Sequence, residues 1–222
     1  MHVEVPKAKN FKEFGGEFLM IVVSILTALL LEYVVETVHH HHKAHDAAER
    51  MDAELRQNLQ QIQEVVKHNE GKIAALTTVQ ATMRASLRNH DTNEAILQRF
   101  GNDVNHKFEM SIRYPTLRRE AWETAVADQS VTWMPREELE HYASAYSAMR
   151  DVSAMFAGGS IHLLDGPRLV DAISDLETGN GDAKTIFRAN NQLMMAYGSI
   201  DAILRSLEKD LQNAPETHAG KT

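Results

Sequence analysis

The sequence predicts an all-α fold, in which an N-terminal transmembrane helix continues into a long stalk helix and a packed helical bundle follows. Three observations lead to this prediction. Residues 18–31 form a run of 14 residues without a charge. Apolar residues between positions 55 and 87 recur with an average spacing near 3.5, which is typical of a helix that packs along one seam. The 222 residues include only 5 Pro and 11 Gly, which leaves room for long uninterrupted helices.

The uncharged run reads FLMIVVSILTALLL and follows Glu17 directly. As a helix it would be about 21 Å long, and continuing through Glu32 to residue 35 would extend it to about 27 Å, near the roughly 30 Å of a hydrocarbon core. A buried core helix and a cleaved signal peptide have similar apolar lengths, and both interpretations are open. No small-residue cleavage site follows residue 31, which favours an uncleaved signal anchor. We therefore expect a short tail over residues 1–17 and a membrane anchor over 18–38, with the lipid bilayer as a partner.

Glu32 lies inside the expected span. A carboxylate in a membrane is a functional hypothesis by default, because it must be protonated or paired there. Alternatively, Glu32 marks the outer end of a short or tilted span. Lys7, Lys9 and Lys12 precede the anchor closely, whereas the basic residues behind it are more widely spaced. This distribution favours a cytoplasmic N-terminus and an exported C-terminal domain.

A histidine-rich collar follows the anchor. His39, His41, His42 and His45 are candidate ligands of a divalent transition metal, because His41 and His45 are four residues apart and would share one helix face. In an oligomer, copies of this pair would converge near the membrane surface. The alternative is that the adjacent imidazoles, His40 among them, point around the helix as a weakly pH-sensitive collar without bound metal.

Residues 39–88 are expected to form this collar and one long heptad-like helix. Leu55, Ile62, Asn69 and Leu76 lie on its seam, which we expect to contact a second copy of the chain or a membrane-protein partner. Asn69 either fixes the register of that contact or lies at the edge of the stripe. The other expected seam positions are Leu59, Val66, Ile73, Gln80, Met83 and Leu87.

Residues 89–212 are expected to form the bundle, and residues 213–222 a flexible tail. Asp91 with Glu94 resembles a capping box that opens a helix ending at Gly101. The apolar–polar alternation over 106–114 predicts either a strand or an extended connector. Thr116 is expected to cap a helix that runs to residue 127.

Three further helices are expected in the bundle. The first begins at Pro135 and ends at the glycine pair 158–159, the second spans about 167–177, and the third begins near Asp182. The aromatic residues Trp122, Trp133, Tyr142 and Tyr146 are expected in the core. The seam of the last helix should contain Ile186, Asn190, Leu193, Tyr197, Ile200, Leu204, Leu207 and Leu211.

Composition excludes several functions. The formal net charge of −8 disfavours a nucleic-acid-binding surface, which needs clustered Lys and Arg. The absence of Cys excludes disulfides, thiolate catalysis and iron–sulfur clusters. The sequence contains no Gly-rich phosphate loop and no recognisable hydrolase or zinc-protease motif. We therefore expect a protein that is not an enzyme and has no cofactor, apart from the possible metal at the collar.

Two stretches of the sequence also resemble a known group of proteins. They are EFLMIVVSILTALLLEYVVE and AWETAVADQSVTWMPREELEHYASAYSAM. This combination resembles a family of uncharacterised bacterial single-pass membrane proteins, in which a glutamate leads a near-N-terminal anchor and an aromatic-acidic stretch precedes a turn and a Leu-rich helix with a Tyr pair. The family usually has Gly in that turn, where this chain has Gln129 and Ser130. The resemblance implies a bacterial source and a membrane location, and it implies no activity.

Three functional hypotheses follow. The first is a membrane-anchored structural or interaction protein that self-associates or docks a partner through its long helix. The second is a metal- or proton-responsive accessory protein that uses residues 39–45. The third is an extracytoplasmic sensor, although an N-terminal tail of about a dozen residues is too short for an output domain. The expected location is the bacterial inner membrane, with the C-terminal domain in the periplasm.

Overall fold

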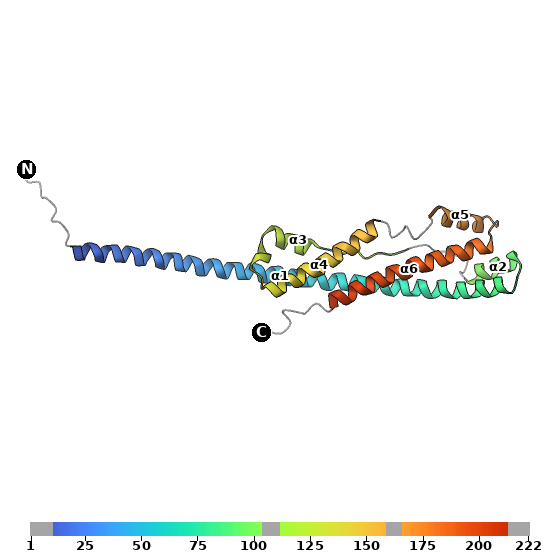
Figure 1. The fold of residues 1–222 in the computed structure, drawn as a ribbon, viewed down its shortest axis with the longest axis horizontal. Helices are drawn as coiled ribbons and strands as arrows, with labels where there is room; N and C mark the ends of the chain where they lie inside the picture. The colour runs from blue at the N-terminus through green and yellow to red at the C-terminus, as the bar shows by residue number, and fades with distance from the viewer. Residues whose placement is uncertain (1–10, 104–111, 159–165, 213–222) are drawn as a thin grey trace, which may run out of the picture.

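The computed structural model describes residues 11–103, 112–158 and 166–212. Within these ranges nearly every residue is helical and no strand occurs, which confirms the predicted all-α fold. Figure 1 shows a long rod whose N-terminal part is a lone helix and whose other end is a bundle. The described segments are α1 (Phe11–Arg88), α2 (Asn93–Asp103), α3 (Glu120–Ala127), the short 3₁₀ helix η1 (Ser130–Trp133), α4 (Arg136–Ala157), α5 (Gly166–Glu177) and α6 (Ala183–Gln212).

Helix α1 is a single element of 78 residues. At 1.5 Å per residue it is about 117 Å long. The expected anchor and the expected stalk are therefore one continuous helix. The helix begins at Phe11, so residues 11–17 of the expected tail are already helical. Residues 1–10 and the expected tail 213–222 lie outside the described residues.

The C-terminus of α1 is closed by a Schellman motif. His90 has a left-handed backbone with φ of 57°, and its N–H donates to the Leu87 carbonyl at 3.4 Å. The N–H of Asp91 donates to the Ser86 carbonyl at 3.1 Å. These bonds satisfy two carbonyl groups that the helix end would otherwise leave unpaired. The chain can then turn back sharply into α2.

Helix α6 runs antiparallel beside α1 and makes the most extensive contact of the bundle with it (Figure 1). All eight positions of its predicted seam are buried, which confirms the predicted periodicity. Among them Asn190 donates from its side chain to the Leu76 carbonyl at 3.0 Å. On the same interface Gln80 of α1 donates to the Asn191 side chain.

The seam of α1 faces the inside of the same chain. Leu55, Ile62 and Asn69 are buried, and Leu76 is half-buried against a small core that includes Leu193 of α6. The structure thus corrects the expectation that this seam meets a second copy or a partner, because the chain's own helices occupy it. The spacing identifies an apolar stripe, and it does not distinguish an internal partner from an external one.

Asn69 lies in the middle of the stripe and is fully buried, which contradicts the alternative that it marks the edge. Its side-chain amide has no hydrogen-bond partner in the described part of the chain. Burying a polar group in this way costs free energy, so Asn69 weakens the α1–α6 interface relative to an apolar residue.

Several predicted helix boundaries are corrected. The α2 cap is Thr92, whose side chain accepts from the Ala95 N–H at 3.3 Å, whereas Asp91 pairs with Arg99. Thr116 caps no helix, because residues 112–119 are irregular and α3 begins at Glu120. Of the expected strand at 106–114, residues 106–111 lie outside the described chain and 112–114 form no strand.

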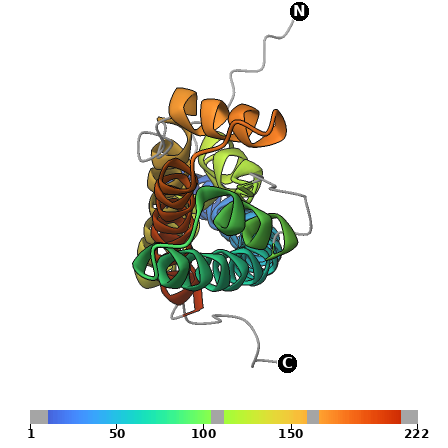
Figure 2. The same cartoon turned by 90° about the vertical axis from the view of Figure 1, so that its right-hand side faces the viewer.

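Three groups of buried residues make up the core. The largest lies nearest the lone helix and joins α1 to α3, α4 and the C-terminal half of α6. A second, around Phe100 and Met83, holds α2 against the far ends of α1 and α6. The third packs α5 on α6 through Leu169 and Leu193. Figure 2 shows α2 and α5 together at the end of the bundle that faces away from the lone helix.

Candidate functional site

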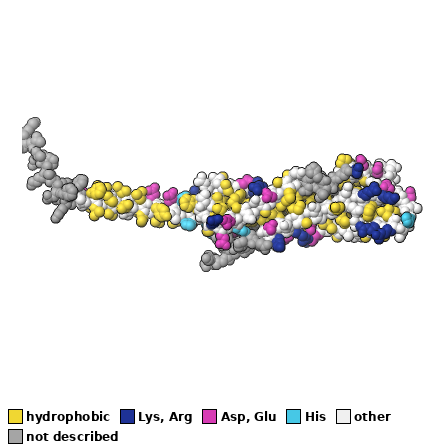
Figure 3. All heavy atoms as spheres, in the orientation of Figure 1, with side chains coloured by type: hydrophobic (Ala, Val, Ile, Leu, Met, Phe, Trp, Pro, Cys, Tyr) yellow, Lys and Arg dark blue, Asp and Glu magenta, His cyan; other side chains and the backbone are white. Residues whose placement is uncertain are grey.

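The most distinctive surface of the molecule is the lone part of α1, residues 18–38, which we call the apolar stretch. It is the one helix in the described chain that is long and apolar enough to cross a membrane. None of this segment is covered by the bundle, and Figure 3 shows it as a nearly continuous band of apolar atoms. The large apolar side chains exposed there are Phe18, Leu19, Met20, Ile21, Val23, Ile25, Leu26, Leu29, Leu30, Leu31, Tyr33, Val34, Val35 and Val38.

The hydroxyl groups of the apolar stretch are satisfied within the helix. Ser24 donates to the Met20 carbonyl and Thr27 to the Val23 carbonyl, both at 2.8 Å. Hydroxyls bonded to the preceding turn in this way are common in membrane helices, because lipid offers no other partner. The serine and threonine hydroxyls of the stretch therefore have partners within the helix.

The two predicted carboxylates bracket the uncharged run. Glu17 and Glu32 are exposed on α1 and lie 15 residues apart, which corresponds to about 22 Å along the helix axis. Tyr33 follows Glu32 and is 69% exposed. Tyrosine is enriched at membrane interfaces, so Glu32 and Tyr33 together are consistent with the outer end of a short span.

The collar does not form a metal centre within one chain. His39, His41, His42 and His45 are all exposed, and His45 lies 3.4 Å from the Glu49 carboxylate. No group of three or more His, Asp or Glu side chains in the described ranges could hold a metal ion. His41 and His45 share a helix face as expected, but they supply only two ligands. No observation on one chain therefore favours the metal hypothesis over the alternative of imidazoles that point around the helix.

One collar residue has a specific partner that the sequence did not suggest. The ring of His40 stacks on the indole of Trp133, with centroids 3.9 Å apart and planes 9° apart. His40 also lies 3.5 Å from the Glu36 carboxylate. Trp133 was expected in the core, and it is instead 48% exposed at the end of η1. The bundle thus contacts α1 directly at the collar.

Small residues permit this contact. Ala44, Ala47 and Ala48 are buried on the α1 face that meets the bundle, where a larger side chain would keep η1 away from the helix. The collar positions 41 and 45 lie on a different, exposed face. The buried line of α1 therefore does not pass through His41 and His45.

The turn before η1 has unusual backbone geometry. Gln129 adopts a left-handed conformation, with φ of 63° and ψ of 15°, which disfavours residues that carry a Cβ atom. Asp128 supports the turn by accepting hydrogen bonds from the Ser130 N–H at 3.0 Å and the Ser130 hydroxyl at 2.5 Å. These hydrogen bonds lower the pKa of the Asp128 carboxyl. The geometry explains why glycine would suit this position.

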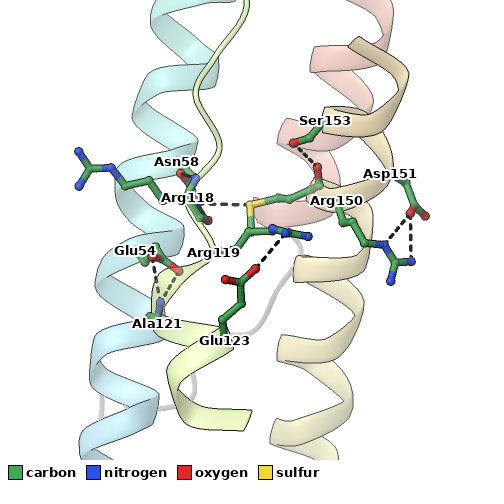
Figure 4. Close-up of polar contacts among 10 residues, drawn as sticks. Glu54, Asn58, Arg118, Arg119, Ala121, Glu123, Arg150, Asp151 and Ser153 are labelled. Atoms are coloured by element: carbon green, nitrogen blue, oxygen red, sulfur yellow. Dashed lines mark hydrogen bonds and ion pairs between the residues drawn. The ribbon is translucent and has the colours of Figure 1, made fainter. Parts of the chain in front are cut away.

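Beyond the collar, a polar network holds residues 118–121, at the start of α3, against α1 (Figure 4). Asn58 bonds the Arg118 backbone twice, donating to its carbonyl at 2.8 Å and accepting from its N–H at 2.9 Å. Glu54 accepts from the Ala121 N–H at 3.1 Å and so caps the first turn of α3. Two residues of α1 therefore fix the path of the chain over residues 118–121.

The same network includes two buried tyrosines of α4. Tyr146 donates to Glu54 at 2.8 Å, and Tyr142 donates to Asp52 at 2.7 Å. Burial raises the pKa of the Tyr146 phenol far above its usual range, and the hydrogen bond to Glu54 raises it further. Trp122 stacks on Tyr146, with centroids 5.5 Å apart. These hydrogen bonds hold α3 and α4 against α1.

Sequence reasoning missed Glu54 and Asn58. A step of three from Leu55 leads to Asn58, and a step of four then leads to Ile62, so Asn58 lies on the buried stripe. A polar residue on an apolar stripe was the available signal. The sequence could not reveal its partner, because the backbone of residue 118 is 60 positions away.

A cavity of about 750 Å³ lies at the far end of the bundle, between α2 and α5. Leu97, Ile173 and Leu176 supply apolar walls, and Glu94 and Glu177 lie at its border. Neither carboxylate has a metal-binding arrangement with a neighbour in the described ranges. The cavity therefore has room for a ligand, but its lining contains no metal-binding group among the described residues.

Comparisons with known proteins identify no match for this chain. No family model, no curated protein and no solved structure matches the chain. The resemblance to bacterial single-pass membrane proteins therefore stays a prediction.

Proposed function

We propose that this protein is a membrane-anchored helical structural and interaction protein. In this proposal α1 crosses a lipid bilayer once, through residues 18–35, and carries the bundle on the same rigid helix. The observation that carries the proposal is the contrast along α1, because the apolar stretch has no protein cover while the bundle on the same helix has a complete core. Each large apolar side chain contributes roughly 1.5–3 kcal/mol when it leaves water. The stretch as a whole therefore strongly favours lipid over water.

The proposed location is the bacterial inner membrane, with the N-terminus in the cytoplasm and the bundle in the periplasm. The three lysines between residues 7 and 12 support this orientation. The bacterial source rests on the sequence resemblance. A protease added to intact spheroplasts should digest the bundle and leave a membrane-protected fragment near residues 18–35. A bundle that is digested only after the membrane is opened would reverse the proposed orientation.

Self-association or partner docking is proposed through the apolar stretch and not through the seam, which α6 fills. Glu32 is the polar side chain best placed for such a contact, because hydrogen bonds between helices in lipid contribute about 0.6–2 kcal/mol. Crosslinking in the membrane tests this proposal. Glu32→Leu should reduce the crosslinked species, whereas Glu49→Leu, beyond the stretch, should not. Equal crosslinking of both variants would remove Glu32 from the contact.

Flotation of the reconstituted full chain with liposomes tests the anchor. Leu26→Arg with Leu30→Arg places two cations near the middle of the span, at a cost of roughly 2.5–3.5 kcal/mol each. We expect this variant to leave the floating fraction, and the matched Leu26→Ala, Leu30→Ala variant to stay in it. Flotation of both variants to the same extent would contradict the proposal.

A further inference from the structure

The end of the bundle nearest the apolar stretch carries an indole that no sequence pattern predicted there. Trp133 is the last residue of η1 and lies against α1 at His40, 93 positions earlier in the chain. Its ring stacks on the imidazole at a centroid distance of 3.9 Å, yet 48% of Trp133 remains exposed. The stack fixes the height of the indole along α1.

That height corresponds to the headgroup layer of a bilayer. His40 lies five residues beyond Val35, the last residue of the proposed span, and a helix rises about 7–8 Å over five residues. The polar layer on each side of a bilayer extends about 5–7 Å beyond the hydrocarbon core. The His40–Trp133 stack therefore lies near the outer edge of this polar layer, a layer in which tryptophan is enriched because its ring is apolar and its N–H is polar.

The second tryptophan of the chain shows that this placement is specific. Trp122 lies in α3, stacks on Tyr146 and packs, partly buried, against the main core. Trp133 has instead one covered face, toward His40, and one free surface at the membrane-proximal end of the bundle. The exposure of Trp133 at the height of the proposed membrane interface commits its free surface to lipid.

We infer that Trp133, held by His40, is a second lipid contact of this protein, with its indole in the headgroup layer beside α1. The inference rests on the proposed membrane anchor and goes beyond it. A single spanning helix can tilt and rotate in a bilayer, and interfacial aromatic anchors limit both motions. A contact on one side of α1 would give the bundle a defined rotation and a defined tilt relative to the membrane surface. The partner it takes is phospholipid, and no particular headgroup is required.

The two tryptophans make the test direct, because each single substitution leaves one indole. The full chain is reconstituted in vesicles of phosphatidylcholine and phosphatidylglycerol that carry bromine either near the headgroup or near the end of the acyl chain. In Trp122→Phe, the remaining Trp133 should be quenched about twofold by the shallow label and much less by the deep one, as its interfacial depth requires. In Trp133→Phe, the remaining Trp122 should be quenched by neither label.

The outcomes separate this inference from the anchor. Vesicles that float with the protein while Trp133 stays unquenched would overturn the inference and leave the anchor in place. If Trp133 stays unquenched and its emission is blue-shifted, a second copy or another protein covers the indole. That outcome also overturns the inference. Protein that does not float would overturn both proposals. If Trp122→Phe fails to fold, the difference in quenching between the parent chain and Trp133→Phe measures the same quantity.

Discussion

The two halves of α1 share one backbone and differ in what surrounds them. Residues 18–38 expose large apolar side chains on all faces, whereas residues 44–88 bury one stripe and expose charged and polar side chains on the other faces. A helix that is apolar around its whole circumference needs cover on all sides, from lipid or from protein, whereas a stripe requires only one protein partner. The change occurs within the collar, where His40 has the bundle on one side and Ala44 is the first fully covered residue. The comparison shows that the distribution of apolar residues around a helix, and not helix formation itself, determines what kind of surroundings can cover it.

The largest expected effect comes from a matched pair of leucine substitutions, one in the bundle and one in the apolar stretch. Leu204 of α6 is fully buried against the bundle half of α1, and Leu26 of the apolar stretch is 60% exposed. Leu204→Ala should lower the free energy of unfolding of the bundle by about 2–5 kcal/mol, because it removes buried methyl groups and leaves a cavity. Leu26→Ala should change it by less than about 0.5 kcal/mol. Urea unfolding in detergent micelles, followed by circular dichroism, measures both; similar losses would show that the apolar stretch is part of the bundle core.

The next effect tests whether the bundle half positions the connector. Asn58→Ala removes both hydrogen bonds to the Arg118 backbone and should cost about 1–3 kcal/mol of unfolding free energy. The neighbouring Gln57 bonds only the exposed Arg118 side chain, at 3.2 Å. Gln57→Ala should therefore change the unfolding free energy by no more than about 0.5 kcal/mol. Hydrogen exchange of the Arg118 amide, faster in Asn58→Ala alone, would locate the effect; no difference between the variants would contradict the assigned role.

A smaller effect concerns the helix that covers α1. Asp182 precedes α6 and accepts from the Thr185 hydroxyl at 2.8 Å and the Thr185 N–H at 2.9 Å, and these bonds lower the pKa of its carboxyl. Because the folded pKa is below the unfolded one, this stabilisation is present above about pH 4 and is lost as the pH falls through the folded value. Asp182→Asn keeps a cap but loses the charge, which should cost about 0.3–1 kcal/mol at pH 7. Unfolding free energies measured between pH 6 and pH 2 should fall less steeply in Asp182→Asn, and a slope equal to that of the parent chain would refute this assignment.

The smallest effect concerns the junction between the two halves. Gln129 is in a left-handed conformation, which costs a residue with a Cβ atom roughly 1–2 kcal/mol, and glycine would lose about 0.4–1 kcal/mol through extra freedom in the unfolded chain. Gln129→Gly should therefore stabilise the bundle by about 0.5 kcal/mol, whereas Gln129→Ala should have little effect. A small upward shift in the urea midpoint with an unchanged slope would support this; destabilisation by Gly would mean that the Gln129 side chain has a role of its own.

Much of the architecture could be predicted from the sequence because the signals are local. The uncharged run and the eight seam positions of α6, seven of them apolar, each predict a helix from residues only a few positions apart. Boundaries that depend on remote partners were predicted less well. Thr116 looked like a helix cap, yet the first turn of α3 is capped by Glu54, which lies 67 positions from Ala121.

The candidate site divides in the same way. The sequence by itself determined the apolar stretch, Glu17 and Glu32 at its borders, and the histidines behind it, because composition along one helix needs no knowledge of the rest of the chain. Only the tertiary structure decided that Leu55, Ile62, Asn69 and Leu76 face their own chain and that Trp133 reaches His40. The physical reason is that periodicity specifies which face of a helix is apolar, whereas what covers that face depends on how segments 60 to 114 residues away in the chain fold back onto it.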